Sequence, residues 1–235
     1  MNNTKVEINF LTEVDFCLDR ADLRDKLKIK EGSSNEERLL KLAEKAEEIA
    51  RPKALYGEVY IEDRGEDWVK VDGLEKVVME SRVLKVNLEG AHKILPYLAT
   101  CGREVEEWSE SIDGMAEGFW VDEMKRRALN AATARLSREL TDGHLPGKSA
   151  AMSPGSLEDW PISEQEKLFA LLGDGPDRIG VELTDSFLML PSKSVSGIRF
   201  PTEIDFESCQ LCPREGCPGR RAPYDEDLYE KRYGL

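Results

Sequence analysis

Two hydrophobic periods mark the first fifty residues. Residues 6–10 alternate apolar and polar side chains, which is the pattern of a half-buried strand. Over residues 34–51 the apolar side chains recur at helical spacing, with Ser34 and Glu37 as a capping pair and Pro52 as a stop. The pattern predicts a strand followed by an amphipathic helix.

The next fifty residues are rich in Val, Ile, Tyr and Trp. They predict an antiparallel meander of three strands at residues 56–61, 68–71 and 76–88, separated by the turn pairs Arg64-Gly65 and Asp72-Gly73. Residues 90–100 return to helical spacing and predict a helix. A short helix carrying Val105 and Trp108 follows.

The second half begins with a long helix at about residues 115–140, whose many small residues suggest close packing against a sheet. A Gly, Pro and Ser-rich loop covers residues 145–159, and a loop of that length is often functional. A helix at residues 162–172 and one or two strands within residues 179–200 complete the predicted elements. Beyond Phe206 the aliphatic side chains become sparse, which predicts a tail lying on the domain.

Composition narrows the function classes. The chain has 235 residues, 40% of them hydrophobic, and a net charge of −14. That charge disfavours nucleic-acid phosphates and anionic membranes as partners, so a protein or a small molecule is expected. No run approaches the roughly 18 apolar residues of a membrane span, and the N-terminus lacks a signal-peptide pattern. We therefore expect a cytoplasmic protein.

Three of the five cysteines, Cys209, Cys212 and Cys217, form a C-x2-C-x4-C array near the C-terminus. In a reducing compartment this spacing favours an iron–sulfur cluster or a zinc site over three reduced thiols, with Cys101, Cys17 or an external group as the fourth ligand. The neighbouring arginines, Arg214, Arg220 and Arg221, would stabilise thiolates. Singly, Cys17 and Cys101 are expected to be packed core thiols.

Several segments in the second half resemble the activation (reactivation) domain of cobalamin-dependent methionine synthase, and more closely its free-standing relatives. The resemblance rests on Ser153-Pro-Gly155, Trp160-Pro-Ile-Ser-Glu-Gln165, Thr184-Asp-Ser-Phe-Leu-Met-Leu-Pro191 and Ser194-Val-Ser-Gly197. It extends from Asn130 to Phe200 and is weaker before Trp108.

The resemblance implies an α+β fold with a central twisted antiparallel sheet and packed helices over residues 1–205, followed by a Cys-rich tail at residues 206–235. It implies a partner of a split methionine synthase or another corrinoid methyltransferase, supporting reductive methylation of cob(II)alamin by S-adenosylmethionine. The cobalamin is carried by the partner, and the electron donor would be a flavodoxin or a ferredoxin. The alternatives are a docking module for the corrinoid protein and an iron–sulfur electron-transfer protein, neither of which binds S-adenosylmethionine.

The resemblance also implies a ligand groove, and the sequence departs from the family there. Ala151 stands where the family has an arginine for the ligand carboxylate, Asn130 where it has an acid for the ligand amine, and Ser156 where a tyrosine usually follows Pro-Gly. Arg199 is the hypothetical replacement cation. Trp160 is expected either to line the groove or to pack in the core. The residues implied in S-adenosylmethionine binding are Asn130, Ser153, Pro154, Gly155, Ser156, Trp160, Ser196, Gly197 and Arg199.

Overall fold

One antiparallel sheet organises the chain, and its central strand is β6 (Lys93–Thr100). The structure is a computed structural model that describes residues 6–72, 77–217 and 219–234. The strands run in the order β1-β2-β6-β3-β4-β5, and β10 joins β6 to β7. The other strands are β1 (Ile8–Leu11), β2 (Lys53–Gly57), β3 (Val59–Arg64), β4 (Trp68–Asp72), β5 (Val77–Glu80), β7 (Ser149–Met152) and β10 (Ser194–Pro201), with a separate hairpin of β8 (Glu182–Leu183) and β9 (Met189–Leu190).

Strand β6 is paired along both of its edges. Strand β2 pairs with its C-terminal half, where Lys53 lies opposite Thr100, and β3 pairs with its beginning, where Tyr60 lies opposite Lys93. The other edge carries β10. Strand β6 is therefore bonded on both edges as well as covered on both faces.

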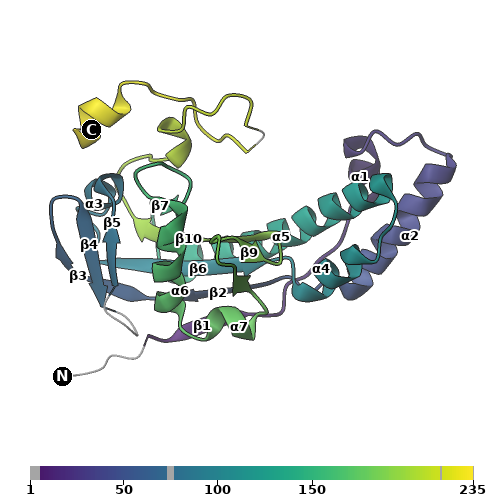
Figure 1. Ribbon diagram of the computed structural model, residues 1–235, viewed down its shortest axis with the longest axis horizontal. Coiled ribbons are helices and arrows are strands. Elements are labelled where there is room, and N and C mark those ends of the chain that lie inside the picture. The colour runs from purple at the N-terminus through teal and green to yellow at the C-terminus, as the bar shows by residue number, and fades with distance from the viewer. Residues whose placement is uncertain (1–5, 73–76, 218, 235) are drawn as a thin grey trace.

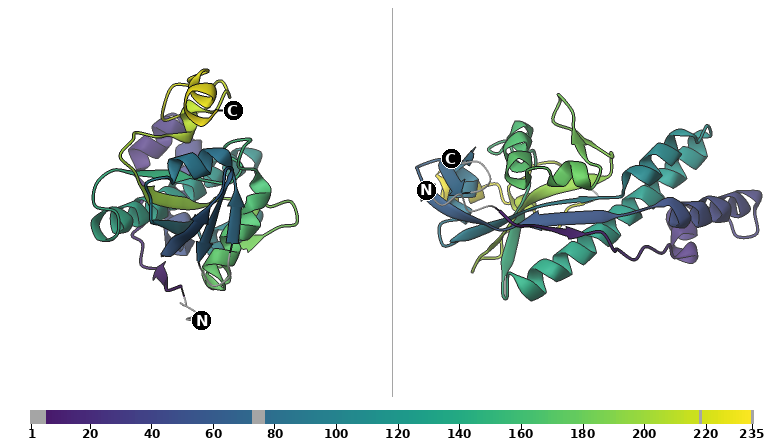
Figure 2. Two further views of the ribbon diagram at one scale, coloured as in Figure 1. Left: turned by 90° about the vertical axis from the view of Figure 1, so that its left-hand side faces the viewer. Right: turned by 90° about the horizontal axis from the view of Figure 1, so that it is seen from below.

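Helices cover the two faces of the sheet (Figures 1 and 2). Ala54 and Tyr56 of β2 pack with Leu136 of the long helix, whereas Leu55 between them packs with Leu172 on the other face. This alternation follows from the period of two in a strand. The helices are α1 (Arg20–Lys26), α2 (Ser34–Ile49), α3 (Arg82–Asn87), α4 (Arg103–Glu110), α5 (Met115–Gly143), α6 (Gln165–Leu172) and α7 (Gly175–Arg178), with short helical turns at Ile162–Glu164, Ser208–Gln210 and Tyr229–Tyr233.

A helical arm extends away from the sheet (Figure 1). It consists of α1, α2, α4 and the first half of α5, and it has its own apolar cluster, which includes Leu39, Ala43 and Met124. The Ser33 hydroxyl caps α2 by accepting from the Glu36 amide, so the cap lies one residue before the predicted Ser34. The arm therefore forms because α5 is long enough to pack against the sheet with one half and against α2 with the other.

Several predicted elements were wrong. Strand β7 lies inside the predicted loop at residues 145–159, and three strands, β8, β9 and β10, stand where one or two were predicted. Residues 90–100, predicted as a helix, contain the central strand β6. A strand buried on both faces has no polar alternation, so its apolar run resembles the spacing of a buried helix. The predicted strand at residues 76–88 is instead β5 followed by α3, which begins where Ser81 accepts from the Leu84 amide. Lys76, the first residue of that predicted strand, and Gly73 of the predicted Asp72-Gly73 turn lie outside the described residues.

The C-terminal tail packs on the sheet domain at two places. Phe206 and Leu211 are buried in the same apolar cluster as β3–β5 and α3, and Tyr233 joins that cluster near the chain end. The Tyr233 hydroxyl donates to the Asn87 side chain at 3.1 Å. The expectation that the tail lies on the domain is therefore confirmed for its described residues.

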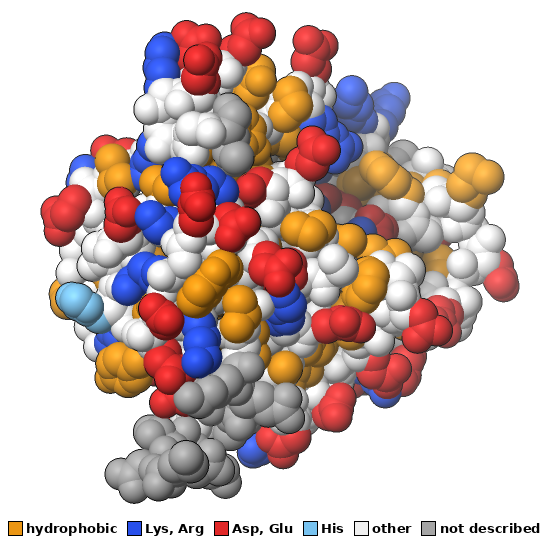
Figure 3. Space-filling view, turned by 60° about the vertical axis from the view of Figure 1, so that its left-hand side comes forward, with side chains coloured by type: hydrophobic (Ala, Val, Ile, Leu, Met, Phe, Trp, Pro, Cys, Tyr) orange, Lys and Arg blue, Asp and Glu red, His pale blue; other side chains and the backbone are white. Residues whose placement is uncertain are grey.

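Acidic side chains project from most of the outline of the face in Figure 3, in keeping with the net charge of −14. Basic and apolar side chains are interspersed among them. Within the described ranges, none of the helices combines the length and the apolar character needed to cross a bilayer.

Candidate functional site

The ladder between β7 and β10 places Arg199 directly opposite Ala151. Directly opposed residues in an antiparallel pair have Cβ atoms about 4.5–5.5 Å apart. The position from which the resemblance expects an arginine is therefore adjacent to an arginine on the neighbouring strand. This neighbour relationship could not be deduced from sequence spacing alone, because 48 residues separate the two positions.

Arg199 and Ala151 line a cavity of about 430 Å³ between the sheet and α5. Asn130 from α5 lines the same cavity, so these three positions are brought together. The full lining comprises Tyr97, Asn130, Thr133, Ala134, Leu136, Ser137, Leu140, Ala151, Val195, Arg199 and Arg221. We call this cavity the arginine pocket.

The Arg199 guanidinium is fixed by one hydrogen bond, but not all of its donors have a partner among the described residues. One terminal nitrogen donates to the Ser137 hydroxyl at 2.8 Å. Its Nε is buried and has no hydrogen-bond partner among the described residues. An unpaired buried donor is costly, so the Arg199 side chain is not fully satisfied by the described residues.

Tyr97 lies between the pocket and the Ser-Pro-Gly loop. Burial raises the pKa of Tyr97, while a hydrogen bond with Ser153 and the charges of Arg199 and Arg221 oppose the increase. Gly197, opposite Tyr97 in the ladder, brings strands close together: a Cβ there would lie 2.5 Å from the Met152 carbonyl oxygen and 2.9 Å from the Tyr97 hydroxyl. The glycine at this position is therefore required by the close backbone approach.

The Ser-Pro-Gly loop borders a second cavity instead. Pro154 is buried, Gly155 has a φ of +78°, and its amide donates to the Trp160 carbonyl at 2.8 Å. Gly155 and Ser156 line a cavity of about 770 Å³ that the tail closes on its other side with Leu211, Cys212, Pro213, Tyr224 and Tyr229. The predicted single groove is therefore two cavities.

Five of the nine predicted groove residues line neither cavity: Ser153, Pro154, Trp160, Ser196 and Gly197. Trp160 is fully buried, which favours the core alternative. Ser196 is buried as well, and its hydroxyl donates to Gln165 of α6 at 2.5 Å. Ser196 faces α6 because alternate residues of β10 point to opposite faces of the sheet.

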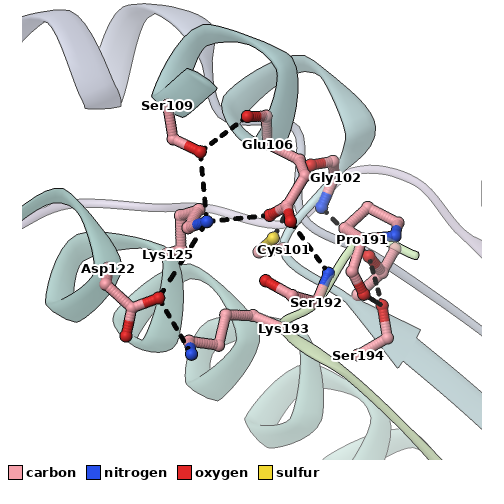
Figure 4. Close-up of polar contacts among 11 residues, drawn as sticks. Cys101, Gly102, Glu106, Ser109, Asp122, Lys125, Pro191, Ser192, Lys193 and Ser194 are labelled. Atoms are coloured by element: carbon pink, nitrogen blue, oxygen red, sulfur yellow. Dashed lines mark hydrogen bonds and ion pairs between the residues drawn. The ribbon is translucent and has the colours of Figure 1, made fainter. Parts of the chain in front are cut away.

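The cysteines do not converge in the structure. Cys101 is fully buried where α4 begins, beside a polar network of Glu106, Lys125 and Asp122 (Figure 4). Burial, and then the charge of Glu106, raises the pKa of the Cys101 thiol to about 12, which disfavours the thiolate that a metal requires. Cys101 thus behaves as the packed core thiol that was the other expectation. The same prediction was wrong for Cys17, which is exposed ahead of α1.

Cys209, Cys212 and Cys217 lie in the tail, which packs beside α3 (Figure 1). Within residues 6–72, 77–217 and 219–234, no three Cys, His, Asp or Glu side chains are placed to hold one metal ion. The predicted iron–sulfur or zinc site with Cys101 as a fourth ligand therefore finds no support in this arrangement.

Sequence reasoning missed three residues of the arginine pocket. Tyr97 was assigned to a helix, and Ser137 lacked any motif on the long helix. Arg221 was noted only as a neighbour of thiols. Arg221 reaches this pocket only because the tail packs back on the domain. No hydrophobic pattern in the sequence predicts that packing.

The sheet and its covering helices have a fold also seen in a solved structure. The structure described as "Crystal Structure of the MetH Reactivation Domain bound to AdoHcy" matches with a TM-score of 0.62 and 16% sequence identity, covering 87% of this chain and 81% of that chain. Residues 137–205 match the family model described as "Vitamin B12 dependent methionine synthase, activation domain". A comparison with curated proteins found no match. The resemblance and the α+β fold class are therefore confirmed.

Proposed function

We propose that this protein is an activation partner of a cobalamin-dependent methyltransferase, and that it binds S-adenosylmethionine in the arginine pocket. The observation that carries the proposal is the position of Arg199 opposite Ala151, in a pocket that also holds Asn130. A cation is thus available for a ligand carboxylate although the usual arginine position is an alanine.

The pocket fits the amino-acid end of such a ligand. Its volume of about 430 Å³ lies in the range of small-molecule sites, about 300–1,000 Å³. Arg199 would bind the carboxylate, with Ser137 fixing the guanidinium. The Asn130 amide oxygen would accept from the ligand amine, which is a weaker contact than the carboxylate it replaces.

The chemistry requires a methyl donor, one electron and the partner's cobalamin. Once reduced by one electron, the partner's cobalamin takes the methyl group from the sulfonium; the carbon–sulfur bond breaks and its electron pair stays on sulfur, which leaves S-adenosylhomocysteine. Within this scheme the present chain binds and orients the donor. We propose that the electron comes from a flavodoxin- or ferredoxin-type protein, and that the cobalamin is carried by a separate polypeptide, as in a split methionine synthase.

Replacing Arg199 with alanine is expected to weaken binding of S-adenosylhomocysteine at least about tenfold, because a charge-assisted hydrogen bond contributes about 1.5–3 kcal/mol. Arg199→Lys should recover part of the loss, since it restores the charge but not the planar fork. Isothermal calorimetry measures both. Arg214→Ala is the matched control, because it removes one exposed tail guanidinium that does not line the pocket. Equal affinity of the Arg199→Ala variant and the control would contradict the assignment.

A second candidate function is a docking module for the corrinoid protein that has no ligand of its own. It is favoured by the pocket lining, which contains no Asp or Glu among the described residues to hold a ligand amine. If the wild-type protein binds neither S-adenosylmethionine nor S-adenosylhomocysteine but is captured by a cobalamin-binding domain, this second function is the correct one.

A further inference from the structure

The described part of the Cys-rich loop of the tail, residues 209–217 and 219–222, is held between the two places where the tail packs on the domain. Leu211 anchors its beginning, and Tyr233 anchors the chain beyond it. Arg82 reinforces the second anchor by donating its Nε to the Tyr233 carbonyl at 3.0 Å. The loop therefore has a fixed place relative to the sheet.

Arg220 organises the interior of this loop. Its guanidinium donates to four backbone carbonyls, those of Cys209 (2.9 Å), Cys212 (2.9 Å), Arg214 (2.5 Å) and Ala222 (3.2 Å). One cation that closes a loop through four carbonyls fixes the backbone on either side of it. The next residue is Arg221.

Arg221 extends from this scaffold to the arginine pocket. Its amide donates to the Cys209 sulfur at 3.4 Å, and its guanidinium pairs with Glu207 at 2.8 Å while 61% of the side chain stays exposed. A guanidinium has five N–H donors, so one ion pair leaves donors for a further acceptor. Arg221 thus lines the pocket rim, whereas Arg199 lies deeper.

The two arginines act on the same space. Both charges oppose the rise in the pKa of Tyr97, and the described lining residues include no carboxylate. Arg221 stays paired with Glu207 at the rim, so the two guanidinium groups offer the pocket hydrogen-bond donors rather than two uncompensated charges. The preferred occupant of the pocket is an anionic group.

We infer that the tail is part of the ligand site: Arg221 and Arg199 together form an anion clamp for the carboxylate of the ligand. The loop that Arg220 organises positions Arg221, the outer residue of the clamp. This inference rests on the proposed function for the identity of the ligand, but not for the existence of an anion site. The clamp explains how a pocket that lacks an arginine at position 151 still binds a carboxylate.

The test uses the full-length protein and three probes: S-adenosylhomocysteine, 5′-methylthioadenosine and inorganic phosphate. Methylthioadenosine keeps the nucleoside and the sulfur but lacks the carboxylate. The variants are Arg221→Ala, Arg220→Ala and the control Arg214→Ala. Arg221→Ala is expected to weaken the binding of S-adenosylhomocysteine about fivefold or more. The affinity for methylthioadenosine should be unchanged. Arg220→Ala should have the same effect without contributing a pocket atom, whereas the control binds as the wild type does.

The possible failures are distinguishable. The wild type could bind phosphate but neither S-adenosylhomocysteine nor methylthioadenosine. If phosphate binding is then lost in Arg221→Ala and Arg199→Ala, the clamp stands and the proposed function fails. If S-adenosylhomocysteine binds equally well to the wild type and to Arg221→Ala, the clamp is overturned while the proposed function stands. A wild type that binds none of the three probes overturns both.

Discussion

Alanine in place of Trp160 is expected to lower the free energy of unfolding by about 3–5 kcal/mol, because it removes a fully buried indole from the largest apolar cluster. The backbone of Trp160 holds the Ser-Pro-Gly loop, since its amide donates to the Leu157 carbonyl and its carbonyl accepts from the Gly155 amide, and alanine keeps both of these bonds. Urea unfolding followed by circular dichroism measures the loss.

Trp160→Phe is the matched control. The Trp160 Nε1 is buried without a hydrogen-bond partner among the described residues, so phenylalanine loses volume but no hydrogen bond. It should cost clearly less than alanine. A loss below about 1 kcal/mol for Trp160→Ala would mean that the side chain is not in the core, and would restore it as a groove residue.

The second large effect is expected at Lys125, at the base of the helical arm (Figure 4). Its ammonium lies 3.0 Å from Glu106 and 3.1 Å from the Ser109 hydroxyl, and only 9% of the side chain is exposed. Lys125→Met keeps the volume but leaves Glu106 without its cation. Breaking a fully buried pair costs about 3–5 kcal/mol; we expect about 2 kcal/mol here because Glu106 retains some exposure.

The pH dependence of that loss has a defined sign. Burial alone would raise the pKa of Glu106, but hydrogen bonds from Lys125 and Ser192 outweigh it and hold the pKa below its usual range. The stabilisation is therefore present above the unfolded-state pKa and disappears as the pH falls through the folded-state pKa. The difference between wild type and Lys125→Met should be largest near neutral pH and shrink in acid.

A double variant separates charge from packing at this pair. Lys125→Met with Glu106→Gln removes both charges and should recover part of the stability that Lys125→Met loses. If Lys125→Met proves neutral at pH 7 and shows the same acid profile as the wild type, the ion pair does not stabilise the base of the arm.

The elements predicted correctly are those with strong local signals. Helix α2 has a hydroxyl cap and a proline stop, and α5 is a long run of helical spacing. Strand β6 was missed because burial of both its faces removes the polar alternation. Helix α3 was missed because six residues are too few to show a helical period.

Only part of the candidate site could be predicted from the sequence, because the rest depends on which face of the strand each side chain takes and on how the tail packs. The resemblance grouped the Ser194-Val-Ser-Gly197 and Ser-Pro-Gly segments in one groove and treated the residues of the first as one surface. The side chains of β10 alternate, so Arg199 faces the pocket while Ser196 faces α6. The contribution of Arg221 depends on tertiary packing of the tail, which leaves no local pattern in the sequence.

The central claim is that this chain presents S-adenosylmethionine to the cobalamin of a partner. Its most direct test follows partner-bound cob(II)alamin by absorbance under a constant reductant, with and without S-adenosylmethionine. The account predicts that the protein accelerates formation of methylcobalamin only when S-adenosylmethionine is present, and that Arg199→Ala weakens this acceleration most at low S-adenosylmethionine concentration. Equal rates with and without the protein, at saturating S-adenosylmethionine, would contradict it.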